Sequence, residues 1–476
     1  MSHTASPTPS DDRLHLLEDA LQGAQAEHVL LRWHHKSTRS VAVEKGRVDN
    51  AASNTYSGIG VRVLAHGSYG FASTDRPERD AIRRAIEAAT AAAKASARQR
   101  REKVPAPPPT KLARGTWESD GARELRERPM EALLRLCLDS EAAARGSSAT
   151  IQSATCGYSE IHEEKAIVTS DGARALVRVA RPELRLFAVA AKNGQMQRGV
   201  ETSGVTGGWQ CLFQRASAAQ MADRAARKAV ELLEAERPQG GRATVILSPA
   251  LVGMLVHEAV GHTVEADFVL AGSVARGRIG TRVASDLVTL EDSGHSEFLA
   301  GAGGLVEVDD EGVPTRRTTI IEQGMLRSYL HDRESAALFG VEPTGNARAW
   351  EYDNEPLIRM RNTYIRPGAG SLEELVAGTD DGWLLEGASN GQADSNGEFM
   401  FGTHEARRIV GGKLGERMKG VNISGSAFDV LQTVDAVTGD FRWDLGSGHC
   451  GKGQPAKVDA GGPWLRCKVV LGGKEA

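Results

Sequence analysis

Two histidines stand five residues apart in His257-Glu258-Ala259-Val260-Gly261-His262, and this spacing restricts the local fold more than any other feature of the sequence. On a regular α-helix, side chains five positions apart point about 140° away from each other. One metal ion can join them only if the helix is widened or broken between them, and a π-type turn is the least costly way to widen it. Gly261 tolerates such a distortion. We therefore expect a local i→i+5 irregularity around Val260–His262.

The same six residues combine two imidazoles with a carboxylate, a set that suits zinc chemistry. Imidazole nitrogens are common zinc ligands, and the adjacent carboxylate of Glu258 can take a proton from a water molecule that zinc has acidified. On these residues alone a second interpretation stays open, in which His257 and His262 are ordinary histidines with structural hydrogen bonds.

The chain has 476 residues, which is too long for one typical hydrophobic core. Proline-rich and glycine-rich stretches indicate where it divides. We expect these segments: a disordered tail (1–12), an N-terminal α/β segment (13–104), a Pro-rich linker (105–115), a central segment with a β-meander and helices (116–238), and a C-terminal domain with the histidine motif (242–476).

Turn residues predict antiparallel strands in the central segment. Asp171-Gly172 and Asn193-Gly194 separate extended runs, and such pairs adopt the positive φ angles that two-residue hairpin turns require. Further along, Ser217 and Gln220 form a capping box at the start of a helix that we expect over Ala218–Glu236.

The C-terminal domain begins with a predicted strand, Ala243–Leu247, and Ser248-Pro249 then provides a strong helix start before the histidines. Short strands separated by Gly, Asp and Asn follow, and Gly387–Gly397 is expected to be a loop. The predicted fold class is α+β. Its N-terminal half has an antiparallel sheet with flanking helices, and its β-rich C-terminal domain carries the histidine motif on a helix.

Composition argues against several classes of protein. The net charge of −4 is unlike that of nucleic-acid binders, which need a clustered basic face. No run of about 18 apolar residues is present to span a membrane. Five scattered cysteines favour a reducing compartment, so we expect a cytoplasmic protein. His34, His162 and His404 have no second ligand at a useful spacing, and we expect them at the surface.

The segment Val256–Phe268 closely resembles the signature of the TldD/PmbA family of zinc metallopeptidases. Further segments resemble the same family, so the likeness runs from about residue 30 to the end of the chain. These segments are Glu44–Val48, Gly58–Val63, Tyr329–Arg333, Pro343–Asn346 and Met360–Tyr364. Taken together, the motifs are highly specific.

The resemblance implies a third metal ligand and a set of functional residues. Metal-binding members of the family have a Cys-Gly-Lys near the C-terminus, which here is Cys450-Gly451-Lys452. His257, His262 and Cys450 are thus expected to hold one Zn²⁺ per chain, with Glu258 as the general base and acid. Substrate contacts are expected of residues in or beside the matched segments, although a structural role is an open alternative for each: His331, Arg333, Arg348 and Arg361.

The resemblance also implies a function and a partner. We expect a zinc-dependent peptidase of the TldD-like, metal-binding type that hydrolyses peptide bonds of unfolded polypeptides or leader peptides. Such proteins pair with a TldE/PmbA-like homologue or with a second copy of themselves, and the pair encloses the site in a chamber.

Two other interpretations stay open. The same site could serve an amide-hydrolysing enzyme of a natural-product pathway, acting on a small-molecule or peptide conjugate. Alternatively, the chain could be a non-catalytic regulatory binding protein with a structural zinc, as the family's older description as a modulator of DNA gyrase implies. Structural zinc sites usually have four protein ligands, and the three expected here disfavour the second alternative.

Overall fold

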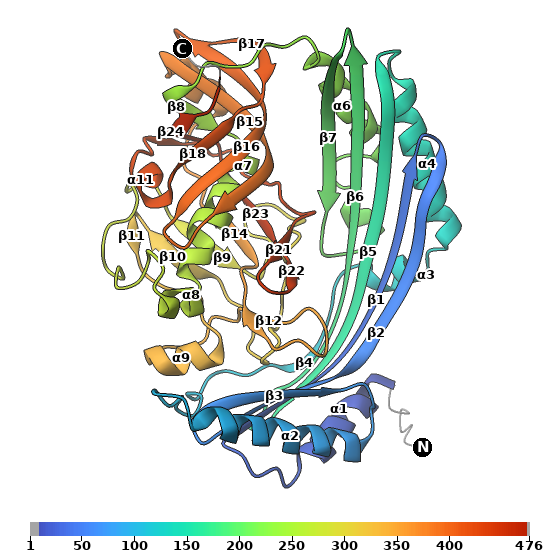
Figure 1. Ribbon diagram of the computed structural model, residues 1–476, viewed down its shortest axis with the longest axis vertical. Helices are drawn as coiled ribbons and strands as arrows, with labels where there is room; N and C mark the ends of the chain where they lie inside the picture. The colour runs from blue at the N-terminus through green and yellow to red at the C-terminus, as the bar shows by residue number, and fades with distance from the viewer. Residues whose placement is uncertain (1–8, 474–476) are drawn as a thin grey trace, which may run out of the picture.

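The computed structural model describes residues 9–473, and its first layer is a curved sheet of seven strands (Figure 1). The strand order is β3-β2-β1-β5-β6-β4, with β7 paired to β6. Neighbouring strands are antiparallel, apart from the parallel pair β4 and β6. The strands are β1 (His28–Glu44), β2 (Arg47–Ala65), β3 (Ser68–Thr74), β4 (Arg114–Glu118), β5 (Ile151–Thr169), β6 (Arg174–Lys192) and β7 (Gln195–Gly204).

Helices cover both ends of this sheet and bury separate apolar clusters against it. At one end lie α1 (Pro9–Leu21) and α2 (Arg79–Ala97), and at the other α3 (Ala122–Glu127), α4 (Met130–Gly146), α5 (Trp209–Leu212) and α6 (Ala218–Glu231). Helix α1 already begins at Pro9, so the expectation of a disordered tail is wrong for residues 9–12. Residues 1–8 lie outside the described part of the chain.

One of the two predicted hairpin turns is confirmed: Asn193 and Gly194 join β6 to β7 with φ angles of 51° and 76°. Asp171-Gly172 lies in the longer connection 170–173 between β5 and β6, where Gly172 has a φ of 116° and Asp171 does not have a positive φ, so the expectation of a two-residue turn is wrong there. The capping box of Ser217 and Gln220 opens α6, which ends at Glu231, five residues before the expected end. The N-terminal and central segments build one sheet, because β1 pairs with β5 along nearly its whole length.

The C-terminal part contains two larger sheets, with strand orders β15-β8-β24-β18-β16-β17 and β11-β10-β9-β14-β23-β20, and two isolated hairpins, β12–β13 and β21–β22. In the first sheet β19 also pairs with β24. The strands are β8 (Gly241–Leu247), β9 (Leu290–Ser293), β10 (Thr318–Glu322), β11 (Met325–Leu326), β12 (Ala347–Arg348), β13 (Leu357–Ile358), β14 (Asn362–Ile365), β15 (Asp381–Ala393), β16 (Glu398–Val410), β17 (Lys413–Lys419), β18 (Asn422–Ser426), β19 (Ala436–Val437), β20 (Arg442–Trp443), β21 (His449–Gly451), β22 (Pro455–Lys457), β23 (Asp459–Gly462) and β24 (Leu465–Leu471).

Short helices complete this part; its largest apolar core includes residues of both sheets, and a smaller separate cluster includes Leu375 and Val376. The helices are α7 (Pro249–Met254), η1 (Leu255–Gly261), η2 (His262–Val264), α8 (Ala266–Ala271), α9 (Arg333–Phe339), α10 (Leu372–Ala377) and α11 (Ala427–Gln432). No helix of the described chain combines the length and the apolar character needed to cross a membrane. The α+β fold class is confirmed.

The loop expected over Gly387–Gly397 is wrong for most of its length. Strand β15 continues to Ala393, and only the residues after it form the turn into β16. Local propensity here is weak, but pairing with β16 supplies the backbone hydrogen bonds, and a register shift between Ala388 and Gly391 accommodates the small residues.

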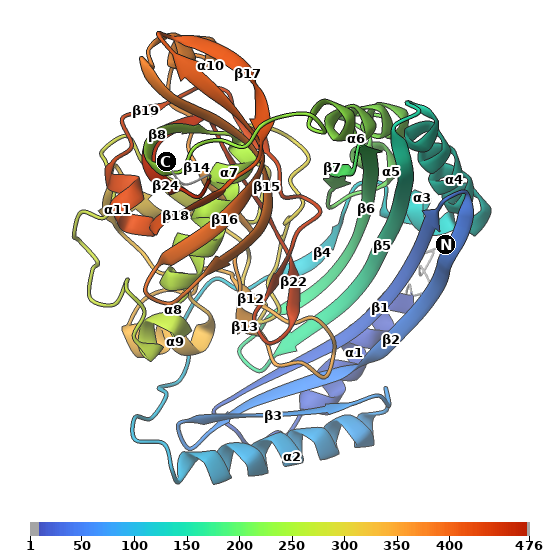
Figure 2. The same ribbon diagram turned by 45° about the horizontal axis from the view of Figure 1, so that its top comes forward.

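The curved sheet lies beside the C-terminal part, and Figure 2 shows the two facing each other across their length. Buried and partly buried ion pairs cross this boundary, among them Arg62–Glu311 at 2.5 Å and Lys165–Asp310 at 2.9 Å.

Two of the histidines expected at the surface are buried instead. His34 lies at the boundary, 3.0 Å from Glu163, and His162 contacts Glu160. Both lie on strands that pair with segments distant in sequence, and His34 contacts Glu163 at a separation of 129 residues, so short-range spacing could not predict their burial.

Candidate metal centre

The helix that carries the histidine motif is widened between His257 and His262. Pro249 occupies the first turn of α7 after Ser248, and the helix then passes into the π-helical turn η1. The backbone N–H of His262 donates to the carbonyl of His257, five residues before it, which confirms the predicted i→i+5 irregularity. Gly261 packs against the Met360 sulfur, where a Cβ atom would clash. As a result both imidazoles lie on one side, with ring centroids 5.3 Å apart.

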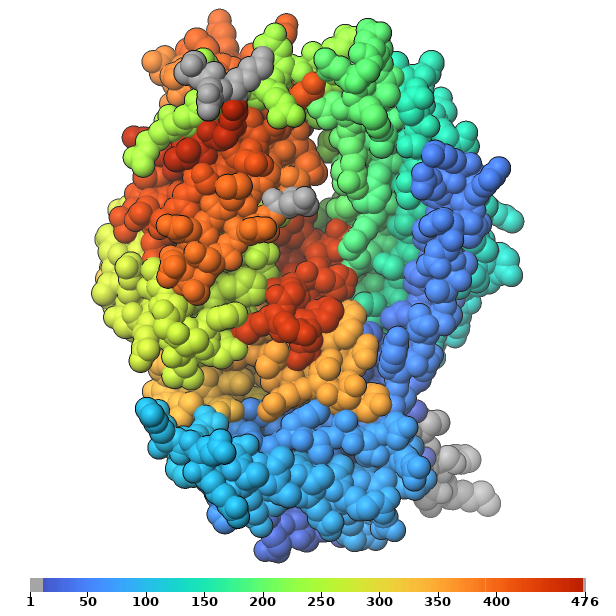
Figure 3. All heavy atoms as spheres, in the orientation of Figure 1, coloured from blue at the N-terminus to red at the C-terminus, as the bar shows by residue number. Residues whose placement is uncertain are grey.

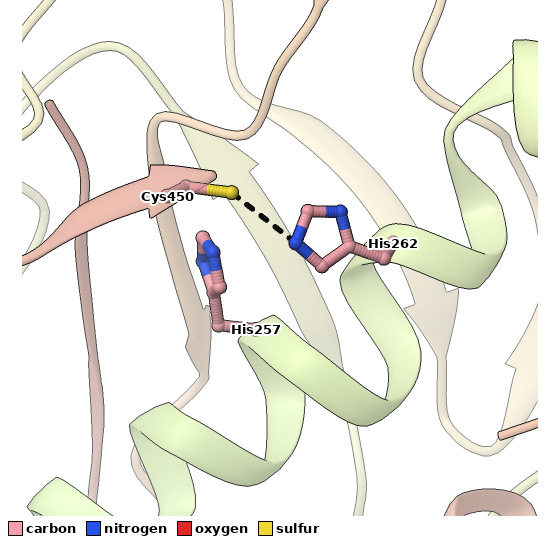
Figure 4. A group of neighbouring side chains, drawn as sticks. All are labelled: His257, His262 and Cys450. Carbon is pink, nitrogen blue, oxygen red and sulfur yellow. Dashed lines mark hydrogen bonds between the residues drawn. The ribbon is translucent and has the colours of Figure 1, made fainter. Parts of the chain in front are cut away.

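Cys450 reaches the two histidines from a distant part of the sequence. It lies on β21, and its sulfur is 3.2 Å from Nε2 of His262 (Figure 4). The ligand atoms of His257, His262 and Cys450 all lie within 4.8 Å of one another. The three residues expected to share a metal ion are thus brought together.

The cluster fits a metal ion chemically. His257 is only 3% exposed, yet neither of its ring nitrogens makes a hydrogen bond of ordinary geometry to any described residue. An unpartnered buried imidazole is costly, and a bound cation would remove that cost. Two imidazoles and one thiolate suit zinc and leave a fourth position open.

The electrostatics favour an ionised thiol. Burial opposes ionisation of Cys450, but the charge of His257, together with the hydrogen bond and charge of His262, outweighs burial and lowers the pKa of Cys450 to about 4. Burial likewise opposes the charge on His262, but Glu265 and Cys450 outweigh it and raise the pKa of His262 to about 10. The metal-free cluster at neutral pH is therefore a thiolate beside an imidazolium.

These pKa values predict that zinc binding releases a proton. Zinc needs a neutral imidazole, and His262 keeps its proton until the pH rises toward about 10, whereas Cys450 is already ionised above about pH 4. We expect at least about one proton released per zinc at pH 7, and an affinity that rises about tenfold per pH unit for each proton. Calorimetric titration in buffers of different ionisation enthalpy measures this; heats independent of the buffer would contradict it.

A carboxylate orients the second histidine. Glu265 is fully buried, and its Oε2 lies 2.9 Å from Nδ1 of His262. Lys452 donates to the same oxygen at 3.0 Å and to Asp267 at 2.8 Å. This arrangement fixes the ring and leaves Nε2 facing Cys450. Sequence reasoning did not select Glu265, although its position three residues after His262, within one helical turn, is a signal that could have found it.

Replacing Glu265 with Gln should weaken metal binding without removing a ligand. The amide oxygen accepts a weaker hydrogen bond from Nδ1 of His262, and the neutral side chain no longer balances the positive charge of Lys452. We expect zinc affinity to fall about 10- to 100-fold, as for other residues that orient metal ligands. Competition with a chromogenic chelator measures it. The matched control is Asp267→Asn, which also contacts Lys452 but not His262. Equal losses in both variants would assign the effect to Lys452.

Three consecutive domain models of one family match the chain. They are the PmbA/TldA metallopeptidase domain 1 over residues 29–93, the central domain over 123–233 and the C-terminal domain over 240–472. A metalloprotease from Methanothermobacter thermautotrophicus is 35% identical to the chain, over 94% of this chain and 96% of that protein. The chain belongs to the PmbA/TldA metallopeptidase family.

Other members of the family are similar as well. A metalloprotease TldD homolog from Haemophilus influenzae is 30% identical over 96% of this chain and 95% of its own length. A zinc metalloprotease TldD homolog from Saccharolobus solfataricus is 38% identical over 51% of this chain and 54% of that protein. The predicted TldD-like membership is confirmed.

Two solved structures share the fold. One is a Thermotoga maritima protein described as a proposed modulator of a DNA gyrase, with a TM-score of 0.77 and 20% identity, covering 97% of this chain and 98% of that one. The other is TldE from Thermococcus kodakarensis, with a TM-score of 0.75 and 19% identity, covering 98% and 99%.

Glu258, the expected proton carrier of the family motif, lies beside the cluster. Its Oε2 is 3.8 Å from Nε2 of His262, and its side chain is 36% exposed. The carboxylate is therefore open to water on one side and close to the ligands on the other.

Two of the arginines that the family resemblance placed among substrate contacts are committed to structural bonds instead. Arg361 is fully buried, donates to Asp292 through Nε at 2.8 Å, and uses both Nη atoms on backbone carbonyls. Arg333 is ion-paired with Asp171 of the β5–β6 connection. Neither guanidinium contacts the three ligands, because each balances a carboxylate from another segment.

The other two expected contacts lie in different surroundings. Arg348 is buried and donates to the carbonyls of Met360 and Lys457, beside the hairpin of Cys450. His331 contacts Ser335 at 3.1 Å, and burial lowers its pKa to about 4. Arg359, which nothing in the sequence singled out, donates to the carbonyl of Cys450 itself.

Proposed function

We propose that the chain is a zinc-dependent peptidase with its active site at His257, His262 and Cys450. The observation that carries the proposal is the unpartnered, buried imidazole of His257 beside a thiolate and a second histidine, with the Glu258 carboxylate at the open side. Zinc bound by these residues would supply a Lewis acid that polarises the scissile carbonyl and acidifies a water molecule.

The side chains around the cluster have separate roles in proton transfer and in positioning the metal ligands. Glu258 takes a proton from the attacking water and later delivers it to the departing amine. Glu265 holds the ring of His262 in the orientation that a metal ligand needs. Arg359 fixes the backbone at Cys450 through the carbonyl of that residue. Glu265 and Arg359 are therefore already in contact with the residues that they are proposed to position.

The proposed substrates are unfolded polypeptides or leader peptides. Support comes from the family membership and from the names of relatives that are called metalloproteases. The number of ligands argues against a purely structural zinc, since structural sites usually have four. We further propose that the chain works paired with a second subunit, either a TldE/PmbA-like homologue or its own copy; the likeness to a TldE structure supports such a pairing.

Removal and return of metal test the proposed function. The purified protein is assayed on a labelled unfolded protein and on a panel of short peptides. Cleavage should disappear after chelation and return when zinc is added, because the ligands alone cannot polarise a carbonyl. Hydrolysis of small amides but not of peptides would favour the natural-product alternative. A zinc-loaded protein that cleaves neither would overturn the proposal.

A further inference from the structure

We propose that Glu183, on the N-terminal sheet, positions the third metal ligand by holding Lys457, on the hairpin that carries Cys450. The inference rests on the proposed zinc site. The inference assigns a positioning role in that site to the N-terminal half of the chain, which supplies no metal ligand.

The hairpin of β21 and β22 cannot hold its own position. Cys450 pairs with Ala456, and the flanking pairs are His449–Lys457 and Gly451–Pro455. Within the described residues neither strand pairs with any further strand. An isolated two-stranded hairpin of this length is marginal in water, so its place depends on side-chain contacts.

One of these contacts is a buried ion pair that crosses the domain boundary. Lys457 Nζ lies 2.5 Å from Glu183 Oε1 on β6, and the two side chains are 1% and 4% exposed. Lys457 also donates to the carbonyl of Gly446, just before the hairpin. A buried lysine that loses its carboxylate must move toward water or give up its proton, and either change disturbs the strand next to Cys450.

Further contacts join the same strands to the same segment. Arg185, two residues after Glu183, donates to the carbonyl of Ser447 at 2.7 Å. Gly204, at the end of β7, approaches Gly446 so closely that a Cβ atom would clash with its carbonyl. In Figure 3, red atoms of the C-terminal domain lie next to the green surface of the central segment. The N-terminal sheet thus supports the hairpin together with Arg348 and Arg359, which donate to the carbonyls of Lys457 and Cys450.

The test compares metal binding in Glu183→Gln, Lys457→Met and the double variant. Cobalt replaces zinc as the probe, because its charge-transfer absorption reports directly on the bond to the Cys450 sulfur. We expect the charge-transfer band to shift or weaken and zinc affinity to fall about 10- to 100-fold in each single variant. If Glu183 acts through Lys457, the double variant should lose no more than the single ones.

Glu311→Gln is the matched control, since it breaks another buried ion pair across the same boundary, with Arg62. We expect it to lower the melting temperature but leave the cobalt spectrum unchanged. Folded Glu183 and Lys457 variants with the parent's cobalt spectrum and zinc affinity would overturn the inference, as would an equal loss of affinity in Glu311→Gln. A parent protein that binds neither metal would instead overturn the proposed zinc site.

Discussion

Replacing Glu258 with Gln should abolish peptide cleavage while the metal stays bound. The amide is nearly the same size as the carboxylate but cannot accept a proton, so both proton transfers assigned to Glu258 are lost. General acid–base catalysis contributes about 10²- to 10⁴-fold, and we expect kcat to fall by that factor. Glu258 is not among the three clustered ligands, so zinc content should remain at that of the parent protein.

Paired measurements of kcat and zinc content in the same preparations check this expectation. Glu322→Gln is a matched control, because Glu322 is an exposed glutamate at the end of β10 that forms an ion pair with Arg327. It should keep both activity and metal. Undiminished cleavage by zinc-loaded Glu258→Gln would rule out the proposed proton carrier. Loss of zinc from that variant would make Glu258 a ligand instead.

Replacing Cys450 with Ala should remove the metal itself. The variant loses the only thiolate of the cluster and leaves two imidazoles, which is too few donors for a tight zinc site. We expect zinc to fall from about one per chain to near zero, with cleavage lost at the same time. Elemental analysis of the purified protein measures the content directly, and His262→Ala should give the same result.

Cys467→Ala provides the matched control for this variant. Cys467 is also buried, but it lies on β24 in the apolar core, and burial raises the pKa of its thiol. Its loss should leave zinc unchanged. If Cys450→Ala keeps its zinc, the third ligand lies elsewhere and the family-based assignment fails. Equal metal loss in both variants would point to general destabilisation.

Features set by neighbours in sequence could be predicted. The π-type turn follows from the spacing of His257 and His262, because only a widened helix lets both rings reach one ion. Turn residues such as Asn193-Gly194 likewise fix their hairpins through φ angles that few other residues adopt. Recognition of Cys450 needed the family resemblance, since an isolated cysteine more often fills an apolar core.

Features set by distant segments could not be predicted. His34 is buried because strands from two parts of the chain and an acidic loop close around it. The family resemblance left open whether Arg361 contacts substrate or has a structural role, because its partner Asp292 lies 69 residues earlier in the sequence, on β9. Weakly structured residues after Gly387 become strand only because β16 pairs with them. In each case tertiary contacts outweigh local preference.

Cys450 is synthesised long after the two histidines of the cluster, because it lies near the C-terminal end of the chain. The ribosome makes this residue 188 positions after His262. At a synthesis rate of about 5–20 residues per second, the ribosome needs roughly 10–40 s to make the residues between His262 and Cys450, and earlier segments can already fold in that time. A nascent chain in that interval presents two imidazoles without their thiolate. If the proposed function holds, the unfinished protein cannot cleave neighbouring nascent chains on the polysome. The site becomes able to hydrolyse peptides only when the last strands, which include Cys450, have been made and folded.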